Sequence, residues 1–368
     1  MAQPRLGQAI RGAIIGARPP PPASEVYPPV SPSPPSPPAK SDQAPPRATE
    51  AELIHAVQAL REQVRWLGEA VDLVRRDHVA MTGELTAIKE SFWRRFDELE
   101  IKTRPLIPFD DESWAVRLMD GYAMIPRAEP AFTVMVANAG SGGLEPGARR
   151  VLQALIEPGM VVADVGANVG LLTLACARAC GPGGRVHAFE PEAGPRAQLA
   201  KTVRLNGLDW VEIHDCAVGA ASGEARLHVS QVIGHSSLYP LPAAEAGGAQ
   251  TVSVRALDDL FAGARLDVVK IDVEGAELDV LAGMARLTEQ NPDLAVVAEF
   301  GPAHLARVGV SPDDWLAAFA DRGFTAFAIE EPWGVCAPFR FEAALEWVNL
   351  ALVRPGGAAE RRLPRQRA

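Results

Sequence analysis

The chain has 368 residues, more than one ordinary domain needs, and 48% of them are hydrophobic, which permits a large core. The formal net charge of −10 argues against a general nucleic-acid binder, because such a protein needs a basic face. Four scattered cysteines argue against a disulfide framework and favour a reducing compartment, so we expect a cytoplasmic protein.

Residues 1–50 form the first segment. Proline, serine and alanine dominate from Pro19 to Pro46, and such a composition cannot bury a core, so we expect a disordered spacer. The alternative is a ligand for a proline-binding module of the SH3 type. No apolar run approaches the roughly 20 residues that span a bilayer. A short amphipathic, arginine-containing stretch at the start permits at most peripheral membrane contact.

Residues 51–102 are predicted to form a long coiled-coil helix. Their apolar residues recur at alternating steps of four and three. The seam begins with these residues: Leu53, Val57, Leu60, Val64, Leu67 and Val71. β-branched residues at the first heptad position with leucine at the fourth favour a parallel dimer, so we expect a homo-oligomer. The alternative is a single amphipathic helix packed on the domain that follows.

The remaining chain has three parts. Residues 103–147 are a connector, in which alternation around Asp120-Gly121 predicts a β-hairpin. From 148 to 355, buried strands alternate with helices. This pattern predicts an α/β domain with a doubly wound, mostly parallel sheet and its site at the carboxyl ends of the strands. Residues 356–368 are predicted to be a basic, disordered tail.

The first buried strand ends in the sequence "VVADVGANVG", which we interpret as a cofactor-binding loop. It provides Asp164, Gly166, Ala167, Asn168 and Gly170. The glycine spacing is not the G-x-G-x-x-G of a dinucleotide fold. A carboxylate at the strand end would repel a pyrophosphate but not a cationic ligand. The alternative is an ordinary turn between a strand and a helix, for which glycine is sufficient.

Two further acids end the next strands. Glu190 follows "VHAF" and is placed to accept from both hydroxyls of a ribose, and Asp215 follows "VEIH" and is placed to accept from an adenine amino group. Ordinary helix-start and turn roles are the alternatives for these two residues. Together with Asp164, they fit an adenosyl group without phosphates, and the sulfonium and amino group of S-adenosylmethionine (SAM) supply matching positive charge.

The fourth buried strand ends in "KIDVEGAE", which supplies the candidate catalytic residues Lys270, Asp272 and Glu274. Alternation puts Lys270 and Asp272 on one face of the strand. Charges in an apolar strand are costly unless they pair, so a purely structural role for the whole cluster is disfavoured. The alternative is a helix start with favourable acids.

The motifs "DVGANVG", "FEPE", "LNG", "HSSL", "VRALDDL" and "VVKIDVEGAE" resemble, in this order, those of the FkbM family of SAM-dependent methyltransferases. The match runs from about Glu145 to Asn349. The resemblance implies a seven-strand class I methyltransferase sheet and methylation of hydroxyls on sugars, polysaccharides or macrolide-type products. It also implies SAM contacts from the 164–170 loop and Glu190, with the Asp272–Glu274 turn beside the transferred methyl.

Removal of a hydroxyl proton is the step that the chain must supply to such a transfer. We expect Asp272 to be the base and Glu274 the second choice, while Lys270 holds an acid or the substrate. His235 is a weaker candidate on a loop near the site. Asp272 and Glu274 are possible oxygen ligands of a metal, but no histidine-rich spacing supports one, so no metal is predicted.

Methylation of nucleic-acid bases is disfavoured, because the usual Asn/Asp-Pro-Pro-aromatic signature is absent after the fourth strand. A different class of function stays open. The coiled coil and spacer occupy over a quarter of the chain, so the protein is alternatively an oligomeric scaffold with a weakly active or inactive methyltransferase-like domain. The intact set of loop and acid residues argues against that alternative.

Overall fold

The computed structural model describes residues 62, 65, 106–140 and 142–365. The chain divides into two units, residues 1–79 and 80–368. In the first unit, Glu62 and Arg65 are helical and exposed. The predicted spacer and the rest of the predicted coiled coil lie outside the described residues, so both stay predictions.

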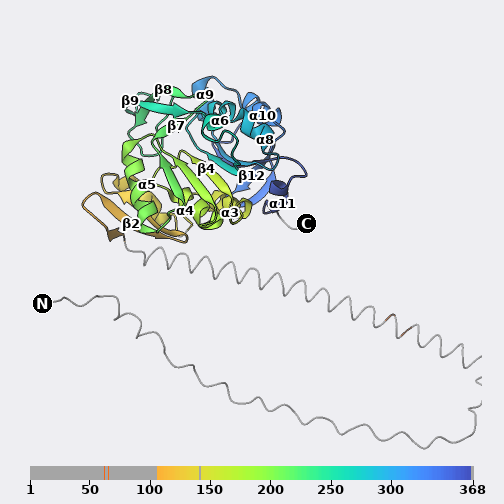
Figure 1. The fold of residues 1–368 in the computed structure, drawn as a ribbon, viewed down its shortest axis with the longest axis horizontal. Coiled ribbons are helices and arrows are strands. Elements are labelled where there is room, and N and C mark those ends of the chain that lie inside the picture. Colours follow the sequence, from red (N-terminus) through yellow and green to blue (C-terminus); the bar gives the residue numbers. More distant parts are fainter. Residues whose placement is uncertain (1–61, 63–64, 66–105, 141, 366–368) are drawn as a thin grey trace, which may run out of the picture. The chain divides into compact units, whose positions relative to one another are not determined.

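An eight-stranded sheet forms the centre of the second unit (Figure 1). In spatial order its strands are β13 (Val335–Pro338), β12 (Thr325–Glu330), β14 (Val348–Val353), β11 (Ala295–Phe300), β10 (Val268–Ile271), β4 (Val161–Val165), β5 (Arg185–Phe189) and β6 (Val211–His214). The strands from β11 to β6 are parallel, whereas β14 is antiparallel to both of its neighbours. The expected mostly parallel sheet is therefore present. The expected number of seven strands is corrected to eight, because β13 folds back antiparallel on β12 as an edge strand.

Helices cover both faces of this sheet, which is why its strands are apolar along their length. Val162 and Val268 belong to one core cluster, which includes side chains of α3 (Pro146–Leu155) and α4 (Leu171–Cys180). Their strand neighbours Ala163 and Val269 belong to the other, which includes side chains of α7 (Glu277–Ala282), α8 (Ala285–Gln290) and α10 (Pro312–Ala320). The alternation of side chains along each strand divides the core in two.

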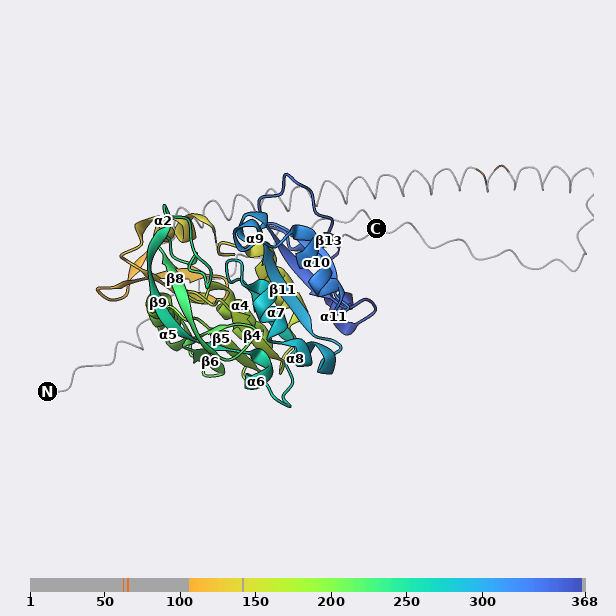
Figure 2. The ribbon, with the colours of Figure 1, turned by 90° about the horizontal axis from the view of Figure 1, so that it is seen from above.

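Two small sheets flank the domain. One consists of β1 (Ile107–Pro108), β2 (Ser113–Leu118) and β3 (Gly121–Pro126), and β2 and β3 pair up to Leu118 and Gly121, where the hairpin was expected. The other has the order β7 (Cys216–Val218), β9 (Ala246–Arg255) and β8 (Gly223–Ser230). In both ribbon views this second sheet lies across the domain from α10 and α11 (Figures 1 and 2).

The remaining helices complete the domain. They are α2 (Pro130–Asn138), α5 (Ala193–Leu205), α6 (Leu257–Leu260), α9 (Pro302–Val308) and α11 (Ala358–Arg362). The last of these contradicts the prediction that residues 356–368 are disordered. Ala359 and Leu363 lie four residues apart, so they face the same side, and both are buried in the core cluster that contains α3.

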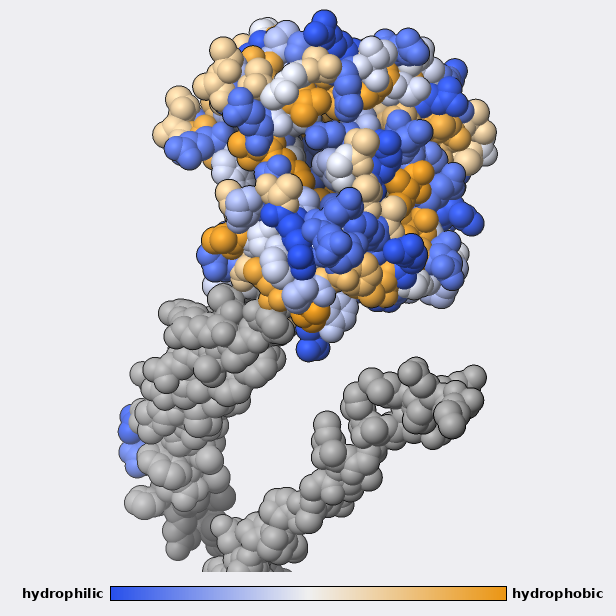
Figure 3. Space-filling view, turned by 90° about the vertical axis from the view of Figure 1, so that its left-hand side faces the viewer, coloured by the Kyte–Doolittle hydropathy of each residue, from blue (hydrophilic) through white to orange (hydrophobic). Residues whose placement is uncertain are grey.

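All four cysteines, Cys176, Cys180, Cys216 and Cys336, are free and buried. On the face of the domain drawn in Figure 3, hydrophilic and hydrophobic side chains are interspersed. Within the part of the chain that the structure describes, no helix has both the length and the apolar character to cross a bilayer.

Candidate active site

The loop between β4 and α4 is held between the ends of two other strands. The backbone N–H groups of Gly166 and Ala167 donate to the carbonyl of Phe189 at 3.1 and 3.0 Å. Gly166 has φ of 78°, and a Cβ there would lie 1.9 Å from the carbonyl oxygen of Asp272. Asn168 also has positive φ, at 50°. The close approach to β10 therefore requires glycine at position 166.

Glu190, after β5, is built into this loop. Its carboxylate accepts from the backbone N–H of Asn168 at 2.9 Å and from that of Glu192 at 2.8 Å. The side chain is buried, and burial raises the pKa of Glu190 to about 7 against the opposing effect of these two hydrogen bonds. Glu190 thus links the loop after β4 to the end of β5, as the alignment of strand ends predicts.

Asp164 lies beneath the loop and lines neither of the two cavities described below. It is fully buried, accepts from the hydroxyl of Thr173 at 2.5 Å, and lies 3.6 Å from the Nζ of Lys270, its partner in the β4–β10 register. A direct contact of this carboxylate with a cofactor is therefore not supported by its position. Its contacts are with Thr173 of α4 and with Lys270, so we expect Asp164 to position these two side chains.

Lys270 is the electrostatic centre of the strand ends. Its Nζ donates to the carbonyl of Gly166 at 2.9 Å and to Asp272 Oδ2 at 3.2 Å. Burial lowers the pKa of Lys270, but Asp272, Asp164 and Glu145 together raise it above its ordinary value. The side chain therefore stays charged and holds two carboxylates in place. It is not itself suited to take a proton.

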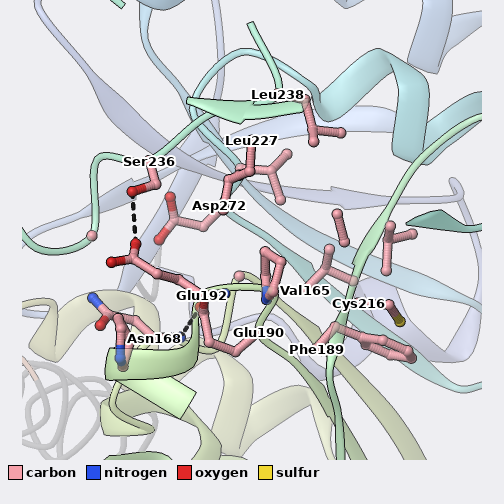
Figure 4. Close-up of a pocket in the computed structure, with 17 residues that line it drawn as sticks. Val165, Asn168, Phe189, Glu190, Glu192, Cys216, Leu227, Ser236, Leu238 and Asp272 are labelled. Atoms are coloured by element: carbon pink, nitrogen blue, oxygen red, sulfur yellow. Dashed lines mark hydrogen bonds between the residues drawn. The ribbon is translucent and has the colours of Figure 1, made fainter. Parts of the chain in front are cut away.

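A small cavity of about 70 Å³, here called the inner cavity, opens beside Glu190 (Figure 4). Its apolar wall comes from β5 and the turn after it, from β7, and from β8 and the loop that follows: Phe189, Pro191, Cys216, Ala217, Val218, Leu227 and Leu238. Its polar side includes Asn168, Glu190 and Asp272, with Ser236, whose hydroxyl lies 2.7 Å from Glu192 Oε2. Such a slot, apolar on one side and hydrogen-bonding on the other, is suited to a flat polar ring.

Asp215 does not line the inner cavity and is exposed. The next residue, Cys216, begins β7 and faces the cavity instead. A hydrogen bond from Asp215 to an adenine amino group is therefore not supported by its position. The wall where this acid was expected is apolar.

A second cavity of about 770 Å³, the outer cavity, shares Gly166, Asn168, Gly234 and Asp272 with the inner one. Its titratable lining is mostly acidic: Glu145, Asp272, Glu274, Glu299 and Glu346, with Lys270, His235 and His304. The predicted catalytic residues Lys270, Asp272 and Glu274 all lie there, and Asp272 is at the junction of the two spaces. His235, the weaker candidate from the sequence, also lines the outer cavity.

Glu274 and Glu299 form a second acidic group with His304. His304 Nε2 is 3.2 Å from Glu274 Oε2, and its Nδ1 is 3.7 Å from Glu299 Oε2. Burial, followed by repulsion from Asp272, raises the pKa of Glu274 to about 8 and that of Glu299 to about 9. Burial also lowers the pKa of His304. The charge of Arg307 opposes the shift at Glu274, but no lysine or arginine of the described residues forms an ion pair with either carboxylate, as Lys270 does with Asp164 and Asp272.

Glu145, Glu299 and His304 were not singled out from the sequence. Glu299 carried a usable signal, because it is a carboxylate within the apolar strand "LAVVAEF". Glu145 precedes α3, and its Oε1 accepts from Asn349 Nδ2 at 2.9 Å. No local pattern could connect those two residues, which are far apart along the chain and meet only when β14 enters the sheet beside β11.

The architecture is a methyltransferase-like α/β fold with a mainly parallel central sheet. Residues 164–326 match the family model described as "Methyltransferase FkbM domain". The match confirms, for these residues, the resemblance of the sequence motifs to the FkbM methyltransferases.

Individual relatives are more distant. The chain is 29% identical over 145 residues to "Methyltransferase 1" of Beauveria bassiana (strain ARSEF 2860). This alignment covers 33% of this chain and 57% of that protein. It is 27% identical over 157 residues to "2-O-methyltransferase NoeI" of Sinorhizobium fredii (strain NBRC 101917 / NGR234), covering 37% and 61%. A solved methyltransferase FkbM from Methylobacillus flagellatus KT aligns at 15% identity with a TM-score of 0.34, covering 56% of this chain and 50% of that one. The chain thus spans less than two thirds of these curated relatives.

Proposed function

We propose that this protein is a SAM-dependent methyltransferase that methylates a hydroxyl of a sugar, polysaccharide or secondary-metabolite-type acceptor. The observation that carries the proposal is the junction at Asp272, where a small slot beside Glu190 meets a large acidic cavity. One space suits a nucleoside and the other an acceptor. The family assignment and the printed name of the 2-O-methyltransferase relative support the same activity.

The residues present fit SAM. The buried Asn168 Oδ1 has no hydrogen-bond partner among the described residues, and it lines both cavities beside Gly166 and Gly234. In the proposed arrangement Glu190 accepts from ribose hydroxyls, and the apolar slot takes the adenine. The acidic junction suits a sulfonium and an amino group. When bound, SAM supplies an activated methyl group on a positively charged sulfur.

Asp272 is the proposed base for the acceptor hydroxyl. It lies at the junction, and its hydrogen bond from Lys270 orients the carboxylate while one side stays open to the cavity, with the side chain 31% exposed. Glu274 is less suited, because its pKa of about 8 leaves it mostly protonated near neutral pH. We therefore place Glu274 beside the acceptor, where a protonated carboxyl donates a hydrogen bond.

The lining of the outer cavity restricts the acceptor. Carboxylates accept hydrogen bonds from hydroxyl groups but repel anions, and the five acidic side chains there outnumber the single lysine. The cavity volume of about 770 Å³ has room for an acceptor of sugar size beside the cofactor. A neutral polyol or amino-sugar acceptor fits this surface, whereas a phosphorylated one does not.

The test is calorimetric titration of the full chain with SAM, followed by incubation with labelled SAM and a cell extract fractionated into glycan, lipid, protein and small-molecule pools. We expect Asp272→Asn to keep SAM binding and to lower turnover by roughly 10²- to 10⁴-fold, the usual contribution of a general base. Asp313→Asn, an exposed acid on α10, is the control. If the wild-type chain binds no SAM, the enzyme proposal fails and the scaffold alternative gains.

The proposal includes the compartment and the oligomeric state of the enzyme. Four free thiols are compatible with work in a reducing compartment such as the cytoplasm. The heptad pattern of residues 51–102 supports a parallel dimer. Light scattering of a chain without that segment should give half the mass of the parent assembly, after correction for the deleted residues, and an unchanged oligomer number would contradict the dimer.

A further inference from the structure

Two histidines and a glutamate lie together on β5 and β6, outside the lining of both cavities. His187 and Glu212 are direct partners in the parallel register, and His214 is two residues further along β6. Side chains two apart on a strand point to the same face, so all three share one side of the ladder. Phe261 packs edge-on against the ring of His187 at 4.8 Å and closes that side.

Their ligand atoms are spaced as a metal ion requires. His187 Nδ1 is 3.0 Å from His214 Nε2, and Glu212 carboxylate oxygens lie 3.6 Å from the first nitrogen and 3.8 Å from the second. Ligands about 2.0–2.1 Å from a tetrahedral zinc ion are separated by roughly 3.3 Å. The observed distances between the ligand atoms lie on either side of this value. All three side chains come from regular strands.

Access also favours a cation. Glu212 is 51% exposed, which leaves an open side for ion entry and a water ligand. Arg185 lies 4.0 Å from Glu212 but is 54% exposed, so it is free to turn away.

We propose that His187, Glu212 and His214 form a binding site for Zn²⁺, with water as the fourth ligand. Two imidazole nitrogens and one carboxylate are a common zinc ligand set with one open position. The competing explanation is a hydrogen bond between the two histidines that closes the cluster without an ion. Both explanations use the same short nitrogen–nitrogen distance, so only binding measurements separate them.

The site adjoins the inner cavity through one ring. His214 stacks on Phe189 at 4.5 Å and 14°, and Phe189 also lines the cavity. The carbonyl of His214 accepts from the backbone N–H of Glu190 at 3.1 Å. Zinc would therefore hold the part of the β5–β6 ladder that carries Glu190. This consequence, a few-fold tighter binding of SAM with zinc present, rests on the proposed function; the zinc site itself does not.

The experiment titrates the chelator-treated full chain with Zn²⁺ by calorimetry, and with Co²⁺ while the visible absorption of tetrahedral cobalt is recorded. We expect His187→Gln and His214→Gln each to weaken zinc binding about 100-fold or more, since even indirect partners of a metal are worth 10- to 100-fold. Glu212→Gln, at an exposed position, gives a second variant that leaves the packed rings in place.

His304→Gln is the matched control. Glu274, Glu299 and His304 also bring ligand atoms within 4.8 Å of one another, so they are the rival location for any bound zinc. Zinc binding that survives His304→Gln but not His214→Gln supports the proposal. Absence of zinc binding, or loss only in His304→Gln, overturns it. If zinc binds as expected but SAM does not bind at all, the proposed function fails and the zinc site stands.

Discussion

Two groups of carboxylates lie on or just after the neighbouring strands β4, β10 and β11, and their surroundings differ. Asp164 and Asp272 share the ammonium group of Lys270. Glu274 and Glu299 share a histidine whose own pKa is lowered by burial, while Arg307 donates to the backbone carbonyl of Glu274. Paired charges stabilise a fold once they are made, whereas unpaired ones oppose it. We therefore expect the first group to hold the site together, and we propose that the second faces the acceptor.

The largest effect should come from removing the shared cation. Lys270→Met leaves Asp164 and Asp272 without their partner, and breaking a buried pair costs roughly 3–5 kcal/mol. Urea unfolding should therefore show a much lower free energy of unfolding. Arg286→Met, which breaks an ion pair whose arginine is 62% exposed, should cost about 1 kcal/mol or less. Equal losses in the two variants would remove the distinction between paired core and surface.

A smaller effect tests which strand-end acid serves the inner cavity. Glu190→Gln should weaken SAM binding by roughly 10- to 100-fold, because it removes charge-assisted hydrogen bonds worth about 1.5–3 kcal/mol. Asp215→Asn, at the exposed position outside the cavity, should bind SAM like the parent chain. Calorimetric titration of both variants decides the matter, and the reverse ranking would restore Asp215 as a cofactor contact.

The mildest test uses pH. The pKa values of Glu274 and Glu299 are raised from 4.5 to about 8 and 9, so the folded chain holds protons that the unfolded chain releases above pH 4.5. Stability should therefore fall as pH rises from about 5 to 9. Glu299→Gln should lessen that fall by on the order of 1 kcal/mol or more, measured by urea unfolding at pH 5, 7 and 9. Parallel curves for variant and parent would show that Glu299 ionises normally.

Much of the site could be predicted from the residues at the carboxyl ends of the strands, because these contacts depend on short stretches of sequence. Alternation within "VVKIDVEGAE" predicted that Lys270 and Asp272 share a face, and the observed 3.2 Å pair agrees. The acid after the second strand, Glu190, lies beside the glycine loop as expected. In a parallel sheet, residues that end neighbouring strands must meet, so these contacts follow from the order of the strands alone.

Three features were beyond that reasoning. The role of Glu299 depends on α9, which brings His304 beside it, and no local pattern specifies that packing. Asp215 was expected at the inner cavity, but the chain turns directly into β7 after it, and the next residue, Cys216, lines the cavity. The tail was expected to be disordered from its basic charge, but two apolar residues one helical turn apart, Ala359 and Leu363, were enough to dock it.

The buried cysteines have a practical consequence for kinetics. Burial raises the pKa of Cys216 and Cys336 to about 11, so few thiolates are present at neutral pH and alkylation of the folded chain should be slow. Reaction with a thiol reagent then reports the rate of local opening. Cys216 lines the inner cavity and Cys336 does not. A molecule that occupies the cavity should slow the alkylation of Cys216. The alkylation rate of Cys336 should stay unchanged and serve as an internal reference.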